Sequence, residues 1–156
     1  MIGPVVKIDP ETRPQRRNIH WLGSKNYQEL PRYLSGWDVG IMPFAINEAT
    51  RFISPTKTPE FLAAGVPVVS TPNSDVVRPY GERRLVEIAS TAEEFAACAE
   101  HLLQRRKAEW LDAVDQHLAG SSWDLTWAAM DRLIQKSRSR QAPWKGAAES
   151  ARVVRV

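Results

Sequence analysis

The stretch that decides the fold is FISPTKTPEFLAAGVPVVSTP, residues 52–72. It opens with a polar turn marked by prolines, continues as a short helix that ends at Gly65, and passes directly into the apolar run VPVVST. A helix that leads at once into an apolar strand is typical of a parallel sheet covered by helices on both faces. The stretch therefore predicts an α/β fold with a ligand site at the edge of the sheet.

The beginning of this helix carries the groups of an anion site. Ser54 and Pro55 form one helix-start signal, and a second signal begins at Thr58. From either start, the backbone N–H groups of Thr56 and Lys57 lack partners within the helix. The Lys57 ammonium adds a full positive charge beside them, so the helix mouth favours a phosphate.

Glu60 follows one turn later, where a carboxylate would repel a phosphate. It fits a ligand site if it accepts hydrogen bonds from a ribose diol, as acidic residues do in dinucleotide-binding folds. In the structural alternative, Ser54 and Pro55 only cap the helix and Lys57 is solvated. Glu60 then only interacts favourably with the helix dipole. The residues alone leave both interpretations open.

Apolar runs and helical patterns alternate along the rest of the chain. We expect strands at Pro4–Ile8, Ile19–Gly23, Val39–Phe44, Pro67–Thr71 and Leu85–Ala89. We expect helices at Tyr27–Gly36, from Thr91 onward, at Lys107–His117 and at Trp123–Lys136. This order predicts a parallel sheet with helices on both faces.

The helix after Ser90 has the strongest local signal. Thr91 and Glu94 have the spacing of a capping box. The apolar stripe that follows consists of Phe95, Cys98, Ala99, Leu102 and Leu103. Cys98 is therefore expected to fill the core and not to act as a reactive thiol.

Length and composition indicate one soluble domain of 156 residues, with 43% apolar and 25% charged residues. No apolar run approaches the roughly 20 residues of a spanning helix, and the start of the sequence lacks the pattern of a signal peptide. The single cysteine fits a reducing compartment, so we expect a cytoplasmic location.

The net charge of +3 is concentrated in the last part of the chain. Residues 132–156 hold seven basic residues and a single acidic one, so the rest of the chain is net acidic. Such a tail is either solvated or a nucleic-acid-binding arm. We expect residues 137–156 to be disordered and expect no nucleic-acid partner.

Large apolar side chains mark the helical region that precedes this tail. Trp123, Trp127 and Met130 share a helix face, and Trp110 lies upstream. They either pack onto the sheet domain or form an interface with a second domain or a partner chain.

Residues 54–72 resemble the signature S-P-x-K-x-x-E-[YF]-x-A-x-G-x-P-V-V of retaining glycosyltransferases with the two-domain GT-B fold, the group 1 or family-four class. NIHWLGSKNYQELPRYLSGWDVGIMPF before it, and DVVRPYGE and SWDLTWAAMDRLI after it, extend the resemblance over residues 2–135. The resemblance implies a Rossmann-like parallel sheet over residues 1–136, a partial C-terminal domain that binds a nucleotide-sugar donor.

The resemblance also implies roles for the residues of the signature. Glu60 would hold the ribose hydroxyls. Lys57, the turn at Ser54 and the backbone at Pro55 and Thr56 would meet the phosphates.

Two further segments are assigned by the resemblance. Ser24 and Lys25 would lie against the base, and Glu48 and Arg51 would border the donor sugar. Many members of the class have a second glutamate eight positions before the one that matches Glu60. This sequence has Phe52 there, so the role of Glu48 does not follow from spacing.

The family's opening strand, its basic phosphate loop and helix, and its acceptor-binding domain with a catalytic histidine have no counterpart in this sequence. The catalytic residues are therefore unknown, and we expect low stability or association with a missing domain or partner chain. The implied function is sugar transfer from a nucleotide-sugar to a saccharide or lipid acceptor, without metal or cofactor. In this reading the chain supplies the donor domain and is inactive alone. The alternatives are a non-catalytic nucleotide-binding or subunit-interaction module and, third, a nucleic-acid binder that uses the tail.

Overall fold

The computed structural model describes residues 1–140 and divides the chain into two compact units, Met1–Asp115 and Gln116–Val156. The boundary between these units lies within helix α5 (Lys107–Ala119), and the predicted division at residue 136 stays a prediction. Trp110 and Val114 are the last buried side chains in the described part of the chain. The first half of α5 is therefore part of the core of the first unit, and the later residues are not.

The first unit is built on a three-stranded parallel sheet in the order β1-β2-β3. The strands are β1 (Gly40–Met42), β2 (Val68–Ser70) and β3 (Val86–Ile88). Their register aligns Ile41 with Val69 and Val69 with Glu87. The α/β fold, the parallel sheet and three of the five predicted strands are confirmed.

The helices of the first unit are α1 (Leu30–Leu34), α2 (Lys57–Ala63), α3 (Ser74–Val76), α4 (Ala92–Gln104) and the start of α5. Short helices of other types are η1 (Pro10–Thr12), η2 (Tyr27–Glu29) and the π-helix η3 (Val77–Gly81). Together η2 and α1 reproduce the helix predicted at Tyr27–Gly36.

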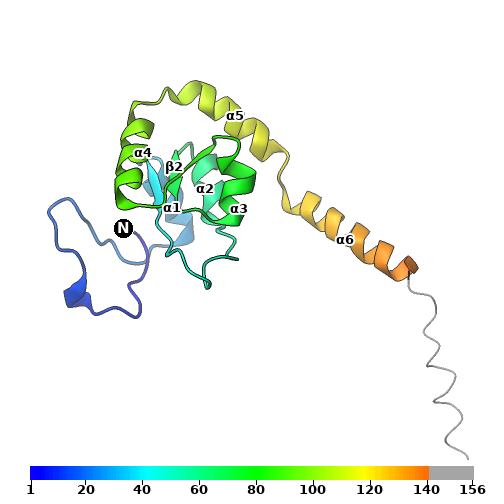
Figure 1. Ribbon diagram of the computed structural model, residues 1–156, viewed down its shortest axis with the longest axis horizontal. Helices are drawn as coiled ribbons and strands as arrows, with labels where there is room; N and C mark the ends of the chain where they lie inside the picture. The colour runs from blue at the N-terminus through cyan, green and yellow to red at the C-terminus, as the bar shows by residue number, and fades with distance from the viewer. Residues whose placement is uncertain (141–156) are drawn as a thin grey trace, which may run out of the picture. The chain divides into compact units, whose positions relative to one another are not determined.

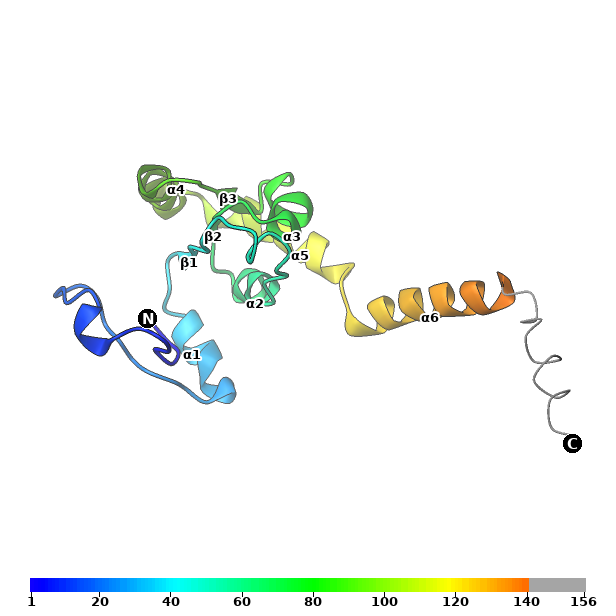
Figure 2. The same ribbon diagram turned by 60° about the horizontal axis from the view of Figure 1, so that its bottom comes forward.

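Helices α2 and α4 cover opposite faces of the sheet (Figures 1 and 2). On the α2 side, a Cβ atom on Gly40 would lie 3.0 Å from the Phe61 ring, so only glycine allows this close approach. On the other side, Leu102 of α4 packs with Val69 and Ala89 in a buried cluster. Because side chains alternate along a strand, successive residues of β2 point to opposite faces of the sheet and can pack against the α2 layer and the α4 layer in turn.

The capping box predicted before α4 is confirmed. The Thr91 hydroxyl accepts from the Glu94 N–H (3.2 Å), and the Glu94 carboxylate accepts from the Thr91 N–H (3.3 Å). Leu103, predicted on the apolar stripe, is 61% exposed. Successive helix residues are about 100° apart around the helix axis, so the Leu102 side chain faces the narrow sheet, whereas the Leu103 side chain points past the sheet into solvent.

Cys98 is half-buried and packs against the α4 cluster, as predicted. Burial raises the pKa of its thiol, and the nearby carboxylates of Glu87 and Glu94 raise it further. The thiol therefore stays protonated at neutral pH, which fits a packing role.

The predicted strands Pro4–Ile8 and Ile19–Gly23 are wrong, because neither segment forms a strand. The residues that precede the first segment do contact the second, since the Gly3 N–H donates to the Gly23 carbonyl (2.9 Å). The backbone has φ of +127° at Gly3, +61° at Lys7 and +67° at Gly23, which interrupts any extended ladder. Apolar residues of these segments stay largely exposed, so no burial stabilises a regular pairing.

Helix α6 (Trp123–Arg140) belongs to the second unit and continues four residues into the predicted disordered tail. This part of the prediction is wrong, because no glycine or proline interrupts KSRSR and basic residues suit the end of a helix. The rest of the predicted tail, residues 141–156, lies outside the described residues.

The apolar row of α6 contains Trp123, Trp127 and Met130, which are 85%, 64% and 51% exposed. Their packing onto the sheet domain or onto a partner remains a prediction. No helix between residues 1 and 140 has both the length and the hydrophobicity needed to cross a membrane.

Candidate functional site

An open cleft of about 440 Å³ lies at the carboxyl ends of β1 and β2. Two loops form its walls: one follows β1, and the other joins β2 to α3. The lining residues are Phe44, Ala45, Ile46, Asn47, Glu48, Thr50, Arg51, Thr71, Pro72, Asn73 and Ser74. Parallel α/β sheets bind ligands at this edge, so the cleft is the first candidate for a site.

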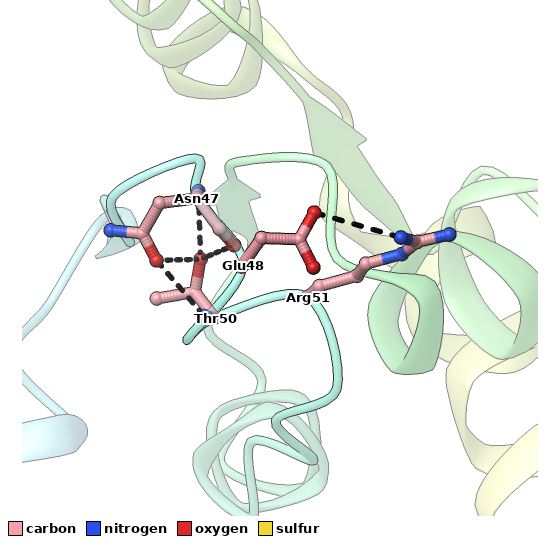
Figure 3. A network of polar contacts seen from close by, with 4 residues as sticks. All are labelled: Asn47, Glu48, Thr50 and Arg51. Atoms are coloured by element: carbon pink, nitrogen blue, oxygen red, sulfur yellow. Dashed lines mark hydrogen bonds and ion pairs between the residues drawn. The ribbon is translucent and has the colours of Figure 1, made fainter.

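The loop after β1 is held by reciprocal hydrogen bonds between Asn47 and Thr50 (Figure 3). The Thr50 N–H donates to Asn47 Oδ1 (3.1 Å), and the Asn47 N–H donates to Thr50 Oγ1 (3.2 Å). The same threonine hydroxyl donates to the Ala45 carbonyl. These side chains replace the missing backbone ladder, so the loop has a defined shape without a helix or strand.

Asn73 joins this loop to the second wall of the cleft. Its side chain is buried, its Nδ2 donates to the Thr50 carbonyl (2.8 Å), and its Oδ1 accepts from the Asp75 N–H (3.1 Å). One amide therefore caps α3 and fixes the loop after β1. Both walls of the cleft depend on this residue.

Glu48 and Arg51 stand on the rim and form an ion pair of 3.6 Å, with side chains that are 87% and 63% exposed (Figure 3). The Arg51 guanidinium also lies 5.2 Å from the centre of the Phe52 ring. Phe52, which stands where the resemblance led us to expect a second glutamate, is thus a stacking partner of Arg51. The rim offers one donor and one acceptor group with no net charge, which suits neutral hydroxyl groups.

Helix α2 begins between the two predicted start signals. Thr56 is the N-cap residue, and Lys57 is the first helical residue. The prediction that Ser54 or Thr58 caps the helix is wrong. Thr58 is instead fully buried, with its hydroxyl 3.7 Å from the sulfur of Met42.

The side chains at the mouth of α2 are open to solvent. Ser54, Thr56, Lys57 and Glu60 are all exposed, and Pro55 is half-buried. Within residues 1–140, Lys57 forms no ion pair, so its ammonium is available to a ligand.

A contact between distant segments places Glu60 beside the turn that contains Ser24 and Lys25. The Tyr27 hydroxyl donates to the Glu60 carboxylate at 3.5 Å, across 33 residues of sequence. The Lys25 ammonium lies 5.8 Å from the Tyr33 ring centre, which holds the turn against α1. The structure thus brings these two segments together, and the roles predicted for their residues stay predictions.

The predicted site residues form two groups, one at the cleft rim and one at α2 with the 24–27 turn. In the described part of the chain, no hydrogen bond or ion pair joins the two groups. Sequence reasoning missed Asn47, Thr50, Asn73 and Tyr27. The N-x-x-T spacing of the first two and the cap-like place of Asn73 before a helix were usable signals.

No group of three or more His, Cys, Asp or Glu side chains in residues 1–140 is arranged to hold a metal ion. The arrangement offers instead hydroxyl, amide and carboxylate groups together with one open ammonium. These groups can recognise a ligand that has both anionic and hydroxyl parts.

Comparison with known proteins gives a consistent result. Residues 3–105 match the family described as "Glycosyl transferases group 1". The chain is 32% identical over 122 residues to the "Putative teichuronic acid biosynthesis glycosyltransferase TuaH" of Bacillus subtilis (strain 168). That alignment covers 76% of this chain but only 30% of the Bacillus protein. No solved structure gives a significant match. Because the family match covers most of the chain, this protein belongs to the glycosyl transferases group 1 family.

Proposed function

We propose that the first unit binds the nucleotide-sugar donor of a glycosyltransferase of the retaining GT-B type. It would correspond to part of the C-terminal domain of such an enzyme. The observation that carries the proposal is the open cleft at the carboxyl ends of two parallel strands, in a chain of the glycosyl transferases group 1 family. The exposed groups of α2 and of the 24–27 turn supply the remaining contacts.

In this proposal the diphosphate lies at the mouth of α2. Lys57 pairs with the phosphates, the Thr56 N–H donates to their oxygens, and the turn at Ser54 and Pro55 lies against them. Glu60 accepts from the ribose hydroxyls. Its contact with Tyr27 is long, at 3.5 Å, so a ribose hydroxyl can displace it at little cost.

The base and the sugar extend in two directions from the diphosphate. Ser24 and Lys25 lie against the base, because the Tyr27 contact places their turn beside Glu60. Glu48 and Arg51 border the sugar at the rim of the cleft.

The reaction breaks the bond between the anomeric carbon and the diphosphate oxygen and forms a bond to an acceptor hydroxyl oxygen. The nucleoside diphosphate leaves with the bonding electrons, and the hydroxyl proton is released. Lys57 stabilises the negative charge that develops on the leaving group. The acceptor, a saccharide or a lipid, is held by parts of the enzyme outside this unit.

Calorimetry with a panel of nucleoside diphosphates tests donor binding. Lys57→Ala and Glu60→Ala should each weaken binding by about 1–3 kcal/mol, because each removes charge-assisted hydrogen bonds. Lys136→Ala and Glu100→Ala are matched controls, since both residues are exposed helical residues without an ion pair in the described chain. Unchanged affinity in both site variants would sink the assignment.

A transfer assay separates the enzyme from the alternative of a non-catalytic nucleotide-binding or subunit-interaction module. Holding an acceptor in reacting geometry can contribute about 7–11 kcal/mol, so we expect the chain alone to bind donor without useful turnover. Addition of a separate protein domain that binds the acceptor should restore transfer. Binding without transfer in every combination would favour the non-catalytic module.

A further inference from the structure

A second hollow, of about 270 Å³, lies at the opposite edge of the sheet from the cleft. It is bounded by the turn that leads into β3 and by the first turns of α5. Four arginines and a single glutamate are among its lining residues: Arg83, Arg84, Arg105, Arg106 and Glu109. The hollow therefore concentrates positive charge in the part of the chain before residue 132, which is net acidic.

Arg105 is fixed by the protein and forms the floor of this arginine hollow. Its guanidinium is 25% exposed, donates to the Arg84 carbonyl (3.4 and 3.5 Å), and lies 5.8 Å from the Trp110 ring centre. Its distance to the Glu87 carboxylate is 4.0 Å. The Arg105 guanidinium is thus already occupied by contacts within the protein, and these contacts hold Arg84, Glu87 and Trp110 around it.

The other three arginines have no such engagement. Arg83, Arg84 and Arg106 are exposed, and none of them forms an ion pair within residues 1–140. Arg106 directly precedes α5, where the helix dipole is positive. Basic side chains there are unfavourable unless an anion is bound, so charge and dipole both point to an anionic ligand.

Arg84 gives an independent argument through its backbone. Its φ is +57°, in the left-handed region that favours glycine. The Leu85 N–H donates to the Tyr80 carbonyl and the Arg84 N–H to the Gly81 carbonyl (both 2.9 Å), which requires this conformation. The chain thus accepts backbone strain to present a guanidinium at the hollow, and such strain is concentrated at functional positions.

We propose that the arginine hollow is a phosphate-binding site, separate from the donor cleft. Guanidinium groups match the geometry of phosphate oxygens and bind them in pairs of hydrogen bonds. The ligand is a phosphate or diphosphate group, either free in solution or on an anionic lipid headgroup. This site does not depend on the donor assignment, because the two hollows lie at opposite ends of parallel strands.

Titration of the full chain with inorganic pyrophosphate, followed in ¹H–¹⁵N spectra, tests the proposal. The indole N–H of Trp110 and the backbone N–H of Arg84 should shift. Arg84→Gly should weaken pyrophosphate binding about fivefold, and the double variant Arg83→Ala/Arg106→Ala about tenfold or more. Arg32→Ala is the matched control, an exposed helical arginine without an ion pair in the described chain, and should change affinity less than about twofold.

A second arm identifies the source of the phosphate. Phosphatidylglycerol vesicles, compared with phosphatidylcholine vesicles, should bind the wild type in an Arg84-dependent way if the ligand is a headgroup. Binding of pyrophosphate alone would assign a soluble ligand. Lack of a Trp110 shift with either probe would overturn the proposal. So would a loss of binding in Lys57→Ala while Arg84→Gly binds normally, because pyrophosphate would then occupy the α2 mouth.

Discussion

Two turns in this molecule have the same hydrogen-bond pattern but different residues at the critical position. After α2, the Val66 N–H donates to the Phe61 carbonyl, and inside this turn the Gly65 N–H donates to the Leu62 carbonyl. Both distances are 2.9 Å. After η3, the pattern repeats around Arg84. The central residue has φ of +70° in the first turn and +57° in the second.

The two turns differ in what surrounds them. A Cβ atom at Gly65 would meet a methyl group of Leu111 at 3.4 Å, which is an ordinary contact, so the backbone conformation and not the available space favours glycine. The Arg84 turn is supported from outside, by the Arg105 guanidinium on its own carbonyl and by the Trp110 indole on the next one. Glycine thus serves the fold at the first turn. At the second, external hydrogen bonds stabilise a turn that presents a charged side chain.

Removal of the hydrogen bond from the Trp110 indole to the Leu85 carbonyl should have the largest effect on the free energy of unfolding. Trp110 is buried, and its Nε1 donates to the Leu85 carbonyl at 3.1 Å. Trp110→Phe takes this donor from a buried carbonyl and should lower the free energy of unfolding by about 1–3 kcal/mol. Urea denaturation of the wild type and the variant measures this change in the free energy of unfolding. Trp21→Phe is the control, because its bond to the Pro14 carbonyl is exposed. Equal effects of both substitutions would contradict the role of external support.

Gly65→Ala should have the next largest effect. The new Cβ is unfavourable at φ of +70°, and the cost is about 1–2 kcal/mol. Gly36→Ala is the control, since that glycine lacks a left-handed φ and a Cβ there would come no closer than 3.7 Å to its neighbours. A neutral Gly65→Ala variant would show that the α2 turn relaxes easily.

Arg84→Gly should give the smallest effect on stability and the opposite sign. Glycine relieves the left-handed strain, so the free energy of unfolding should rise by about 0.5–1 kcal/mol. Arg83→Gly, at a neighbouring residue without positive φ, should lower it by a similar amount. If both variants are destabilised alike, the strain at Arg84 is not relieved by glycine, and the contrast with Gly65 loses its basis.

The sheet could be predicted wherever the local pattern and the tertiary environment agree. The runs around Val69 and Val86 are apolar. The first forms the central strand β2, the second forms β3 beside it, and both valine side chains are buried. PVVKI at residues 4–8 is equally apolar, yet it forms no strand. Strand formation depends on a neighbour with free hydrogen-bonding groups, and composition does not report that neighbour.

The candidate site could be proposed from the residues of one helix, whereas the contacts that join it to distant segments could not. Glu60 and Lys57 follow from the signature, and both are exposed in the structure. The Tyr27 contact with Glu60 spans 33 residues, and the Asn73 link to Thr50 spans 23. Contacts at such separation depend on how strands and helices pack, so local patterns do not reveal them.

The capping box of α4 has a consequence for the order of events in folding. Its bonds connect residues three apart, so they form within the microsecond that helices require. The strands must instead bring together Met42 and Ser70, which are 28 residues apart, and such distant pairing is slower. Helix α4 is therefore expected to exist before the sheet. Leu102 then offers Val69 an apolar surface on which the parallel strands can assemble.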